Sequence, residues 1–481
     1  MNAKCAFALS AALLVSFFPS ALRAQGLTGQ VSGSVQDPAG AAVTGARISL
    51  INAGTGQARE STTDGSGAFV FTELLPGAYQ ISVEVPGFKR YEQKDMNLSS
   101  GERVTLRQIT LELGQVSETL SVTAEAARLQ TQSAERSGLI TNTQIKQLAL
   151  KGRDYLGLVR LLPGVVDSAN REAPGFNSIQ GININGAREH TINLTLDGVS
   201  NLDTGSMSGP FISPSLDAIG EVKVLLTNYQ AEYGRSSGGT INVVVKNGTK
   251  DFHGVAYYFI RNDALNANEY FNNQQGLRKP RYHYNDAGYT IGGPVIIPKI
   301  TRNRNKLFFF WSEEFIPRKE PQPQLRRTFP TTLERQGNFS QTLDTNGRVI
   351  PIMDPLNNRV AFPGNVIPAN RIDKGGQGLL NVFPLPNVRD PNNTFNNAFQ
   401  NIVDHPWRQE LLRLDWNVSS NTLFYIRMIE TAEAFKSAMD TNLGARNWPQ
   451  FPTNYKLTGM GLVTTLIHTF SPTLVNEFTF G

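Results

Sequence analysis

The chain is poor in the residues that build disulfide frameworks and metal sites. Its one cysteine, Cys5, lies near the start, so almost the whole chain must be stable without disulfide bonds. His283 and Asp286 are the nearest thing to a ligand pair, and we interpret them as surface polarity. The sequence has no nucleophile elbow, phosphate loop or calcium loop. We therefore predict no catalytic residue, no metal and no cofactor. The histidines are scattered singly: His190, His253, His283, His405 and His468.

The chain also lacks concentrated charge. It has 45 basic and 40 acidic residues, for a formal net charge of +5. No basic run or basic stripe with interleaved aromatic residues is present, so the pI near 9.1 reflects a small imbalance rather than a patch. We predict no nucleic-acid partner.

Long hydrophobic runs are absent except at the N-terminus. Lys4 precedes an apolar run from Ala6 to Phe18, which Pro19 and small residues up to Ala24 follow. This three-part layout is typical of a secretory signal. A membrane anchor is the alternative, but the run is shorter than the roughly 20 residues that a spanning helix needs. We expect a signal peptide over residues 1–24, and Cys5 precedes the apolar run, where it would not be lipid-modified at the cleavage point.

Short alternating strands and turn glycines fill residues 27–113 and predict a small β-sandwich. The expected strands are 29–35, 46–51, 68–71, 79–85 and 104–111. The turns Asp37-Pro-Ala-Gly40 and Leu75-Pro-Gly-Ala-Tyr79, with Gly87-Phe88, resemble the carboxypeptidase regulatory-like domain. That resemblance implies a transthyretin-like, carbohydrate-binding-like fold without peptidase activity, because the zinc ligands and general base are missing.

Apolar residues at helical spacing follow over 143–162. Ile145 and Leu148, then Tyr155, Val159 and Leu162, keep i, i+3, i+4 spacing and predict a helix with a core-facing stripe that ends at Pro163-Gly164.

Two blocks of strands and glycine turns carry the most specific signal. Residues 182–188 (Ile-Asn-Ile-Asn-Gly-Ala-Arg) and 193–199 (Asn-Leu-Thr-Leu-Asp-Gly-Val) read as two short strands, the second running into an Asp-Gly turn. Residues 217–246 place a strand, a glycine-rich turn and a second strand in one order. Both blocks resemble the plug domain of TonB-dependent outer-membrane receptors, and residues 228–235 are similar to the Oar-like branch. One departure is that Asn183 and Asn185 stand where the family usually has an arginine.

The resemblance implies structural rather than ligand-binding roles in the plug for a set of residues: Gly186, Arg188, Asp197, Gly198, Glu221, Tyr233, Gly234, Gly238, Gly239 and Asn242.

The segment just before the plug is strand-like and similar to the TonB box of these receptors. That box is a strand to which the inner-membrane energy transducer TonB adds by edge pairing. An ordinary interdomain strand is the alternative. The residues that we expect to contact TonB are Glu118, Thr119, Leu120, Ser121, Val122, Thr123 and Ala124.

From residue 251 the chain becomes rich in aromatic strands of about ten residues. Leu412, Leu414 and Trp416 alternate with Arg413 and Asp415. One apolar and one polar face at this length is typical of a membrane β-barrel, although a soluble sandwich gives a similar alternation.

A 90-residue segment, 317–406, interrupts these strands and holds 12 of the 26 prolines. Such a segment cannot cross a bilayer. We interpret it as a long extracellular loop that captures ligand, with a disordered insertion as the alternative.

The expected fold is mainly β: a transthyretin-like sandwich (27–113), a linker (114–124), an α+β plug (125–250) and the first strands of an antiparallel transmembrane barrel (251–481). Six or seven barrel strands are too few to enclose a plug, so we expect a longer receptor or a truncated product.

The function implied by the resemblance is that of a TonB-dependent outer-membrane receptor, with TonB and membrane lipid as partners and a periplasmic N-terminal domain. The ligand could be a siderophore, an oligosaccharide, a peptide or an exported protein. The alternative is a surface or periplasmic adhesion protein whose sandwich binds carbohydrate or protein, with Phe69, Phe71, Tyr79 and Phe88 available as either sugar platform or core.

Overall fold

The structure is a computed structural model of residues 1–481. It describes residues 27–116, 119–123, 133–169, 171–175, 179–205, 207, 209–234, 236–274, 278–297, 303–321, 324–438, 453–471 and 474–481. The expected signal peptide, Glu118 and Ala124 lie outside these residues, and the side chains of Thr119, Val122 and Thr123 are likewise not described.

The N-terminal unit is a β-sandwich, as the turn pattern predicts. One sheet has the order β4-β1-β7 with β8 also paired to β1, and the other has the order β3-β2-β5-β6-β9. Alternate residues of both sheets point inward and form one apolar core that includes Val31, Ile48, Phe71 and Ile81. The strands are β1 (Gly29–Gln36), β2 (Arg47–Asn52), β3 (Ala58–Thr62), β4 (Ala68–Leu74), β5 (Gly77–Glu84), β6 (Arg90–Leu98), β7 (Arg103–Thr105), β8 (Ile109–Thr110) and β9 (Thr119–Thr123).

The sandwich differs from the sequence-based expectation in three places. Residues 104–111 do not form one strand, because the chain leaves β1 between β7 and β8, although both strands run parallel to it. Strands β3 and β6 were not expected. Finally, β9 lies beyond the expected boundary at residue 113 and pairs in parallel with β6, so the sandwich reaches into the segment that was expected to be a linker.

The plug is built on a five-stranded sheet of order β10-β15-β16-β13-β14. Its core is dense and apolar, with Ile182, Leu194, Val222 and Ile241 fully buried. A small antiparallel pair, β11 with β12, lies beside it. The strands are β10 (Arg136–Thr141), β11 (Val165–Asp167), β12 (Ile182–Ile184), β13 (Asn193–Leu196), β14 (Val199–Ser200), β15 (Ile219–Thr227) and β16 (Thr240–Val245).

The single helix predicted over 143–162 is wrong. The chain forms a short helix α2 (Asn142–Gln147), which a Thr141 capping box begins, and a separate 3-10 helix η1 (Tyr155–Leu161). Between them the chain turns sharply, with Arg153 at φ +52°. The predicted inward residues Ile145, Tyr155 and Val159 are buried, but Leu148 is exposed. The predicted stop at Pro163-Gly164 is confirmed, since η1 ends at Leu161 and Leu162 is its C-cap.

The third unit is a nine-stranded sheet that includes seven long, consecutive antiparallel strands. Arg413, Asp415 and Arg427 are buried against the plug, whereas Trp416 and Met428 face outward and are about half exposed. A polar inner face and an apolar outer face are the membrane-barrel pattern, which confirms the predicted alternation. The long strands are β17 (His253–Asn262), β18 (His283–Pro294), β19 (Leu307–Ile316), β24 (Trp407–Asn417), β25 (Thr422–Ala438), β26 (Thr453–Ser471) and β27 (Leu474–Phe480).

The proline-rich segment has a fold of its own rather than the irregular chain of a disordered insertion. Asn365 ties three stretches together: its amide donates to the carbonyls of Phe339 (2.7 Å) and Ile350 (2.9 Å), and its Oδ1 accepts from the Ile352 amide. Asp354 pairs with Arg371 through two hydrogen bonds. We call residues 324–400 the distal module. Its elements are β21 (Leu325–Arg327), α4 (Thr332–Arg335), η4 (Pro363–Asn365), η5 (Ala369–Arg371), α5 (Lys374–Val382) and β22 (Asn397–Phe399), and β20 (Arg318–Pro321) and β23 (Ile402–Asp404) join it to the sheet.

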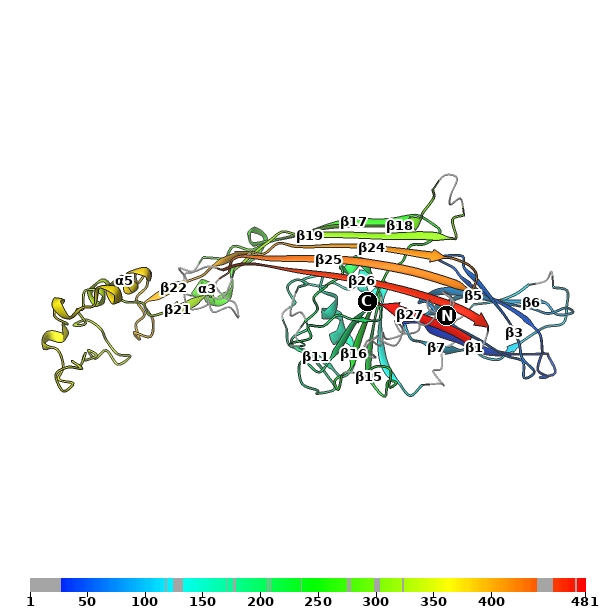
Figure 1. Cartoon of the computed structure of the whole chain (residues 1–481), viewed down its shortest axis with the longest axis horizontal. Coiled ribbons are helices and arrows are strands. Elements are labelled where there is room, and N and C mark those ends of the chain that lie inside the picture. Colours follow the sequence, from blue (N-terminus) through cyan, green and yellow to red (C-terminus); the bar gives the residue numbers. More distant parts are fainter. Residues whose placement is uncertain are drawn as a thin grey trace, which may run out of the picture.

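The units lie in a row along the long axis (Figure 1). The distal module extends from one end of the sheet, the sandwich lies at the other end, and the plug packs against the concave middle. The connections between the long strands are shorter at the sandwich end (295–306, 418–421 and 472–473) than at the distal end (263–282, 317–406 and 439–452). In the described residues, the structure contains no helix with the length and apolarity required to cross a membrane.

Candidate functional site

The predicted Asp-Gly turn joins β13 to β14 and fixes the position of a buried carboxylate. Asp197 and Gly198 both have positive φ, +51° and +78°, which is the type I′ geometry of a tight hairpin. The Asp197 side chain is 1% exposed and accepts a hydrogen bond from the Val245 amide at 3.0 Å. The turn therefore connects the end of β13 to the end of β16 through this hydrogen bond.

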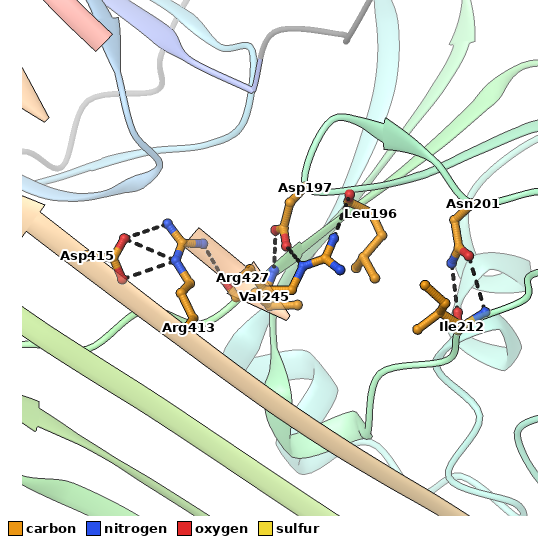
Figure 2. A network of polar contacts seen from close by, with 8 residues as sticks. All are labelled: Leu196, Asp197, Asn201, Ile212, Val245, Arg413, Asp415 and Arg427. Carbon is orange, nitrogen blue, oxygen red and sulfur yellow. Dashed lines mark hydrogen bonds and ion pairs between the residues drawn. The ribbon is translucent and has the colours of Figure 1, made fainter. Parts of the chain in front are cut away.

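The same carboxylate also holds the plug to the barrel wall. Its second oxygen accepts from Nε of Arg427 on β25 at 2.8 Å, and the Arg427 guanidinium also donates to the Leu196 carbonyl (Figure 2). Arg427 is 2% exposed. A charge removed from water to this degree is stable only with a partner, so Asp197 and Arg427 depend on each other.

A second arginine of the wall reaches the plug beside it. Arg413 on β24 forms a bidentate pair with Asp415 two residues along the same strand, and its Nη1 donates to the Val245 carbonyl at 3.4 Å (Figure 2). The amide and the carbonyl of Val245 are thus both bound, one by Asp197 and the other by the wall.

The plug also sends one arginine of its own into the wall. Arg153 pairs with Asp217 of the plug at 2.6 Å and with Asp286 of β18 at 3.0 Å, while Glu314 of β19 lies 3.8 Å away. Burial alone would lower the pKa of Arg153, but the carboxylates of Glu314 and Asp286 outweigh it and raise this pKa further. Its guanidinium also lies over the ring of Tyr257 at 4.4 Å.

The glycines of the two plug blocks are required for different reasons. A Cβ at Gly238 would lie 2.6 Å from Oγ1 of Thr191, and one at Gly239, where φ is +114°, would lie 2.8 Å from the Leu225 carbonyl. Gly186 has φ +73° in an exposed turn, whereas Gly234 is surrounded by open space. Of these four positions, only Gly238 and Gly239 require glycine because neighbouring atoms leave no room for a Cβ.

Three further plug-block residues are placed by polar contacts. Oδ1 of Asn242 accepts from the Thr195 hydroxyl at 2.8 Å between β16 and β13. Glu221 points out of the plug sheet and accepts from the Ser100 amide of the sandwich at 2.6 Å. Tyr233 is 6% exposed, packs edge-to-face on Tyr229 and reaches the same sandwich loop.

Comparison with protein families matches all three units. The outer membrane beta barrel domain matches residues 244–481, the TonB-dependent receptor plug domain residues 129–241, and the carboxypeptidase regulatory-like domain residues 30–112. The chain belongs to the TonB-dependent outer-membrane receptors. This family consists of receptors and transporters rather than of enzymes. The protein is located in the outer membrane.

The chain is similar to parts of individual proteins, and it spans less than half the length of each of them. The chain is 26% identical over 263 residues to the TonB-dependent transporter Oar of Myxococcus xanthus, a match that covers 52% of this chain and 23% of that protein. The siderophore receptor PirA from Acinetobacter baumannii has a TM-score of 0.41 and 13% identity, covering 72% of this chain and 39% of that one. The transporter YddB from Escherichia coli has a TM-score of 0.39 and 13% identity, over 70% and 37%.

The TonB-box-like segment of this receptor is the edge strand β9. Its register pairs Tyr91 with Leu120 and Glu92 with Ser121 along β6, and Leu120 packs on the sandwich core while Ser121 is exposed. Within the described residues no strand pairs with the other edge of β9. Its backbone can therefore accept one more strand without leaving β6.

Several predicted site residues have no functional setting in the receptor. Arg188 is exposed, and its backbone carbonyl accepts a hydrogen bond from the Thr191 hydroxyl at 2.6 Å. Phe69, Phe71 and Tyr79 are buried in the sandwich core and Phe88 packs against it, so these four rings do not form a sugar platform.

The histidine expectation needs one correction. His283 lies 3.3 Å from Asp263, whereas Asp286 points to Arg153, so the two are not a pair. Asp286 is also fully buried, so the interpretation as surface polarity is wrong for this residue. No group of three or more His, Cys, Asp or Glu side chains in the described part of the chain has a metal-binding arrangement.

Sequence reasoning missed the arginines that join plug and wall. Arg153 lies in a stretch that was expected to be helical, and its partners lie on β18 and β19, far along the chain. Alternation on the barrel strands placed Arg413 and Arg427 on the inner face. A lone arginine on a lumen-facing position was therefore a usable signal, although it did not identify a partner.

Proposed function

We propose that this receptor binds an extracellular ligand at the distal end of its barrel and passes it through the plugged lumen with energy transmitted by TonB. The observation that carries the proposal is the position of β9. It is an edge strand whose outer edge is free among the described residues, and the plug begins at β10, about a dozen residues farther along the chain. A partner paired with β9 could thus pull on the plug directly.

The orientation of the receptor supports this arrangement. Short turns lie at the periplasmic end of outer-membrane barrels and long loops at the extracellular end. The sandwich and β9 lie at the short-turn end, and the distal module lies at the other (Figure 1). The box therefore faces the compartment into which TonB reaches.

The distal module supports the capture of ligand outside the cell. It is a folded unit with several exposed apolar side chains, among them Leu356, Val360 and Leu379. Loops that present such side chains are common binding surfaces. The chemical class of the ligand stays open between siderophore, oligosaccharide, peptide and exported protein.

The test is a disulfide trap between β9 and TonB. Ser121→Cys places one exposed thiol on β9, and Thr110→Cys on β8 is the matched control on the opposite sheet. With single-cysteine variants of the TonB C-terminal domain, we expect cross-linking at residue 121 well above that at residue 110. Equal yields at the two positions would contradict the assignment of β9 as the TonB box.

A second variant asks whether the strand itself is recognised. Leu120→Pro removes a backbone donor and the side chain that packs on the sandwich. We expect it to abolish the residue-121 cross-link while the receptor stays in the outer membrane at normal level.

A further inference from the structure

Hydrogen bonds join the sandwich directly to the plug. The Ser100 amide donates to Oε1 of Glu221 at 2.6 Å, and Nη2 of Arg103 donates to Oε1 of Gln230 at 3.0 Å. Farther along, the Lys250 amide, just after the last plug strand, donates to the Gly54 carbonyl at 2.9 Å. Ser100 is 2% exposed, so the first of these bonds is closed to solvent.

The sandwich bonds at the same time to the end of the barrel wall. Nη2 of Arg59 donates to Oγ1 of Thr469 near the end of β26, at 2.9 Å. The Thr28 hydroxyl lies 2.9 Å from Oε2 of Glu477 on β27 and also contacts Glu73 of the sandwich. One domain thus touches both the plug and the wall that surrounds it.

The character of this interface differs from that of a permanent one. The sandwich has a closed apolar core of its own, and in the described residues no buried apolar cluster crosses from it to the plug or wall. The hydrogen bonds across the interface surround two cavities of about 230 Å³ and 460 Å³, and the first cavity is also lined by apolar side chains such as Leu74, Val244 and Ile467. The same cavity is lined by Arg59, Glu221 and Asp415, one from each unit. Permanent interfaces have apolar, well-packed centres, whereas cavities interrupt this one and no shared apolar cluster closes it in the described residues, so it is suited to separation and return.

The sandwich also carries the strand on which TonB would act. Because β9 is paired along β6 and Leu120 packs on the sandwich core, a partner bound to β9 holds the whole sandwich as well as the start of the plug. Pulling on β9 away from the membrane therefore loads the Ser100–Glu221 and Arg59–Thr469 contacts together.

We propose that the sandwich with β9 is a periplasmic clamp, which ties the plug to the barrel wall at rest and must be detached before the plug can move. The inference rests on the proposed function, because the force is supplied by TonB at β9. It assigns to the carboxypeptidase regulatory-like domain a mechanical role, in which its binding partner is the plug of the same chain.

The first experiment measures exposure of the clamp interface in cells that produce the receptor from its natural gene. A Ser100→Cys variant is treated with a small maleimide that enters the periplasm, with the proton gradient intact or collapsed by a protonophore. Residues 27–481 contain no other cysteine. We expect labelling at residue 100 to be at least several-fold faster with the gradient, and labelling of exposed Thr110→Cys to be unchanged.

The Ser121→Cys trap, run in parallel, separates the two proposals. Cross-linking at residue 121 together with gradient-independent protection of residue 100 would overturn the clamp and leave the TonB assignment intact. Absence of both signals would overturn both proposals. Gradient-dependent labelling of residue 100 without a cross-link at 121 would support the clamp and move the site of pulling elsewhere.

A disulfide across the interface gives an independent check. A Cβ on Gly54 would lie 3.4 Å from the Thr249 side chain, so Gly54→Cys/Thr249→Cys can tie the sandwich to the base of the plug. The matched control, Arg47→Cys/Thr62→Cys, joins opposite exposed residues of β2 and β3 within the sandwich. In single-molecule pulling through the TonB C-terminal domain, the oxidised interface pair should remove the first, low-force rupture and the control pair should retain it. A low-force rupture that survives the interface disulfide would overturn the clamp.

Discussion

Replacing Asp197 by Asn should loosen the plug within its wall. The substitution keeps the side-chain volume and leaves an oxygen that can still accept from the Val245 amide, but it removes the charge opposite Arg427. Arg427 is 2% exposed and would become an uncompensated buried cation. Breaking a buried ion pair from one side costs about 3–5 kcal/mol, and the retained hydrogen bond places the expected loss near the lower end.

The assay is native-state hydrogen exchange at the Val245 and Asp197 amides of the purified receptor, which reports the free energy of local opening. The variant should lower that free energy by about 3 kcal/mol. The barrel can be followed separately by fluorescence, because all four tryptophans lie beyond residue 300. Their signal should change little at the temperature of the exchange experiment.

Two control variants test whether the unpaired charge of Arg427 causes the loss. The double variant Asp197→Asn/Arg427→Met removes both charges and should recover most of the loss, since an apolar replacement of a buried pair is often neutral. The exposed pair of Arg47 and Glu60 is the surface counterpart, and Glu60→Gln should cost less than about 1 kcal/mol. A loss below about 1 kcal/mol in the single variant, or no recovery in the double variant, would refute the argument.

The remaining predictions concern the plug and the clamp. Gly152→Ala should lower the melting temperature, because its Cβ would lie 2.2 Å from the Glu172 backbone and overpacking costs about 1–3 kcal/mol, whereas Gly234→Ala, in open space, should not. Burial raises the pKa of Glu221 to about 7, although the hydrogen bond from the Ser100 amide acts to lower it. Clamp docking should therefore be strongest when Glu221 is protonated, and it should weaken as the pH rises from 4.5 through about 7. Urea titrations of docking at pH 5 and pH 8 should show this loss, and Glu221→Gln should abolish the pH dependence.

The pH prediction depends on the charges that face Glu221. Lys223 lowers its pKa and Glu102 raises it, but both effects are smaller than that of burial. Lys223 is itself paired with Glu135 at 3.0 Å, which limits its help to Glu221. Docking of the sandwich therefore favours the protonated form of Glu221, so docking becomes weaker as the pH rises.

Faces of strands could be predicted from the sequence because the side-chain period of a strand is two. Leu414 and Arg413 had to point to opposite sides, and in a membrane barrel the apolar side is the one that meets lipid. The partner of Arg427 could not be found in the same way, because Asp197 lies 230 residues earlier and its orientation depends on a turn that closes only when β13, β14 and β16 come together.

The failures have equally local causes. Apolar residues do recur at helical spacing over 143–162. That spacing cannot show that the backbone of Glu172 packs against Gly152, where it leaves no room for a continuous helix. Strand β6 contains Glu92, Gln93, Lys94 and Asp95, which are uncommon in strands. It forms because β5 and β9 flank it, and tertiary pairing of this kind overrides propensity.

The position of polar groups explains how a plugged barrel can be both stable and able to open. The sandwich has a closed apolar core of its own, whereas in the described residues the plug core also includes three wall side chains, Phe310, Leu411 and Ile429. The other contacts between units include ion pairs and hydrogen bonds, whose protein partners water can replace when the units separate. A plug held to its wall by an extensive apolar core, rather than by these three side chains, would have to expose that surface to move. One held by Arg153, Arg413 and Arg427 can exchange protein partners for water, so displacement costs least at these arginines and at the clamp, while the fold of each unit survives.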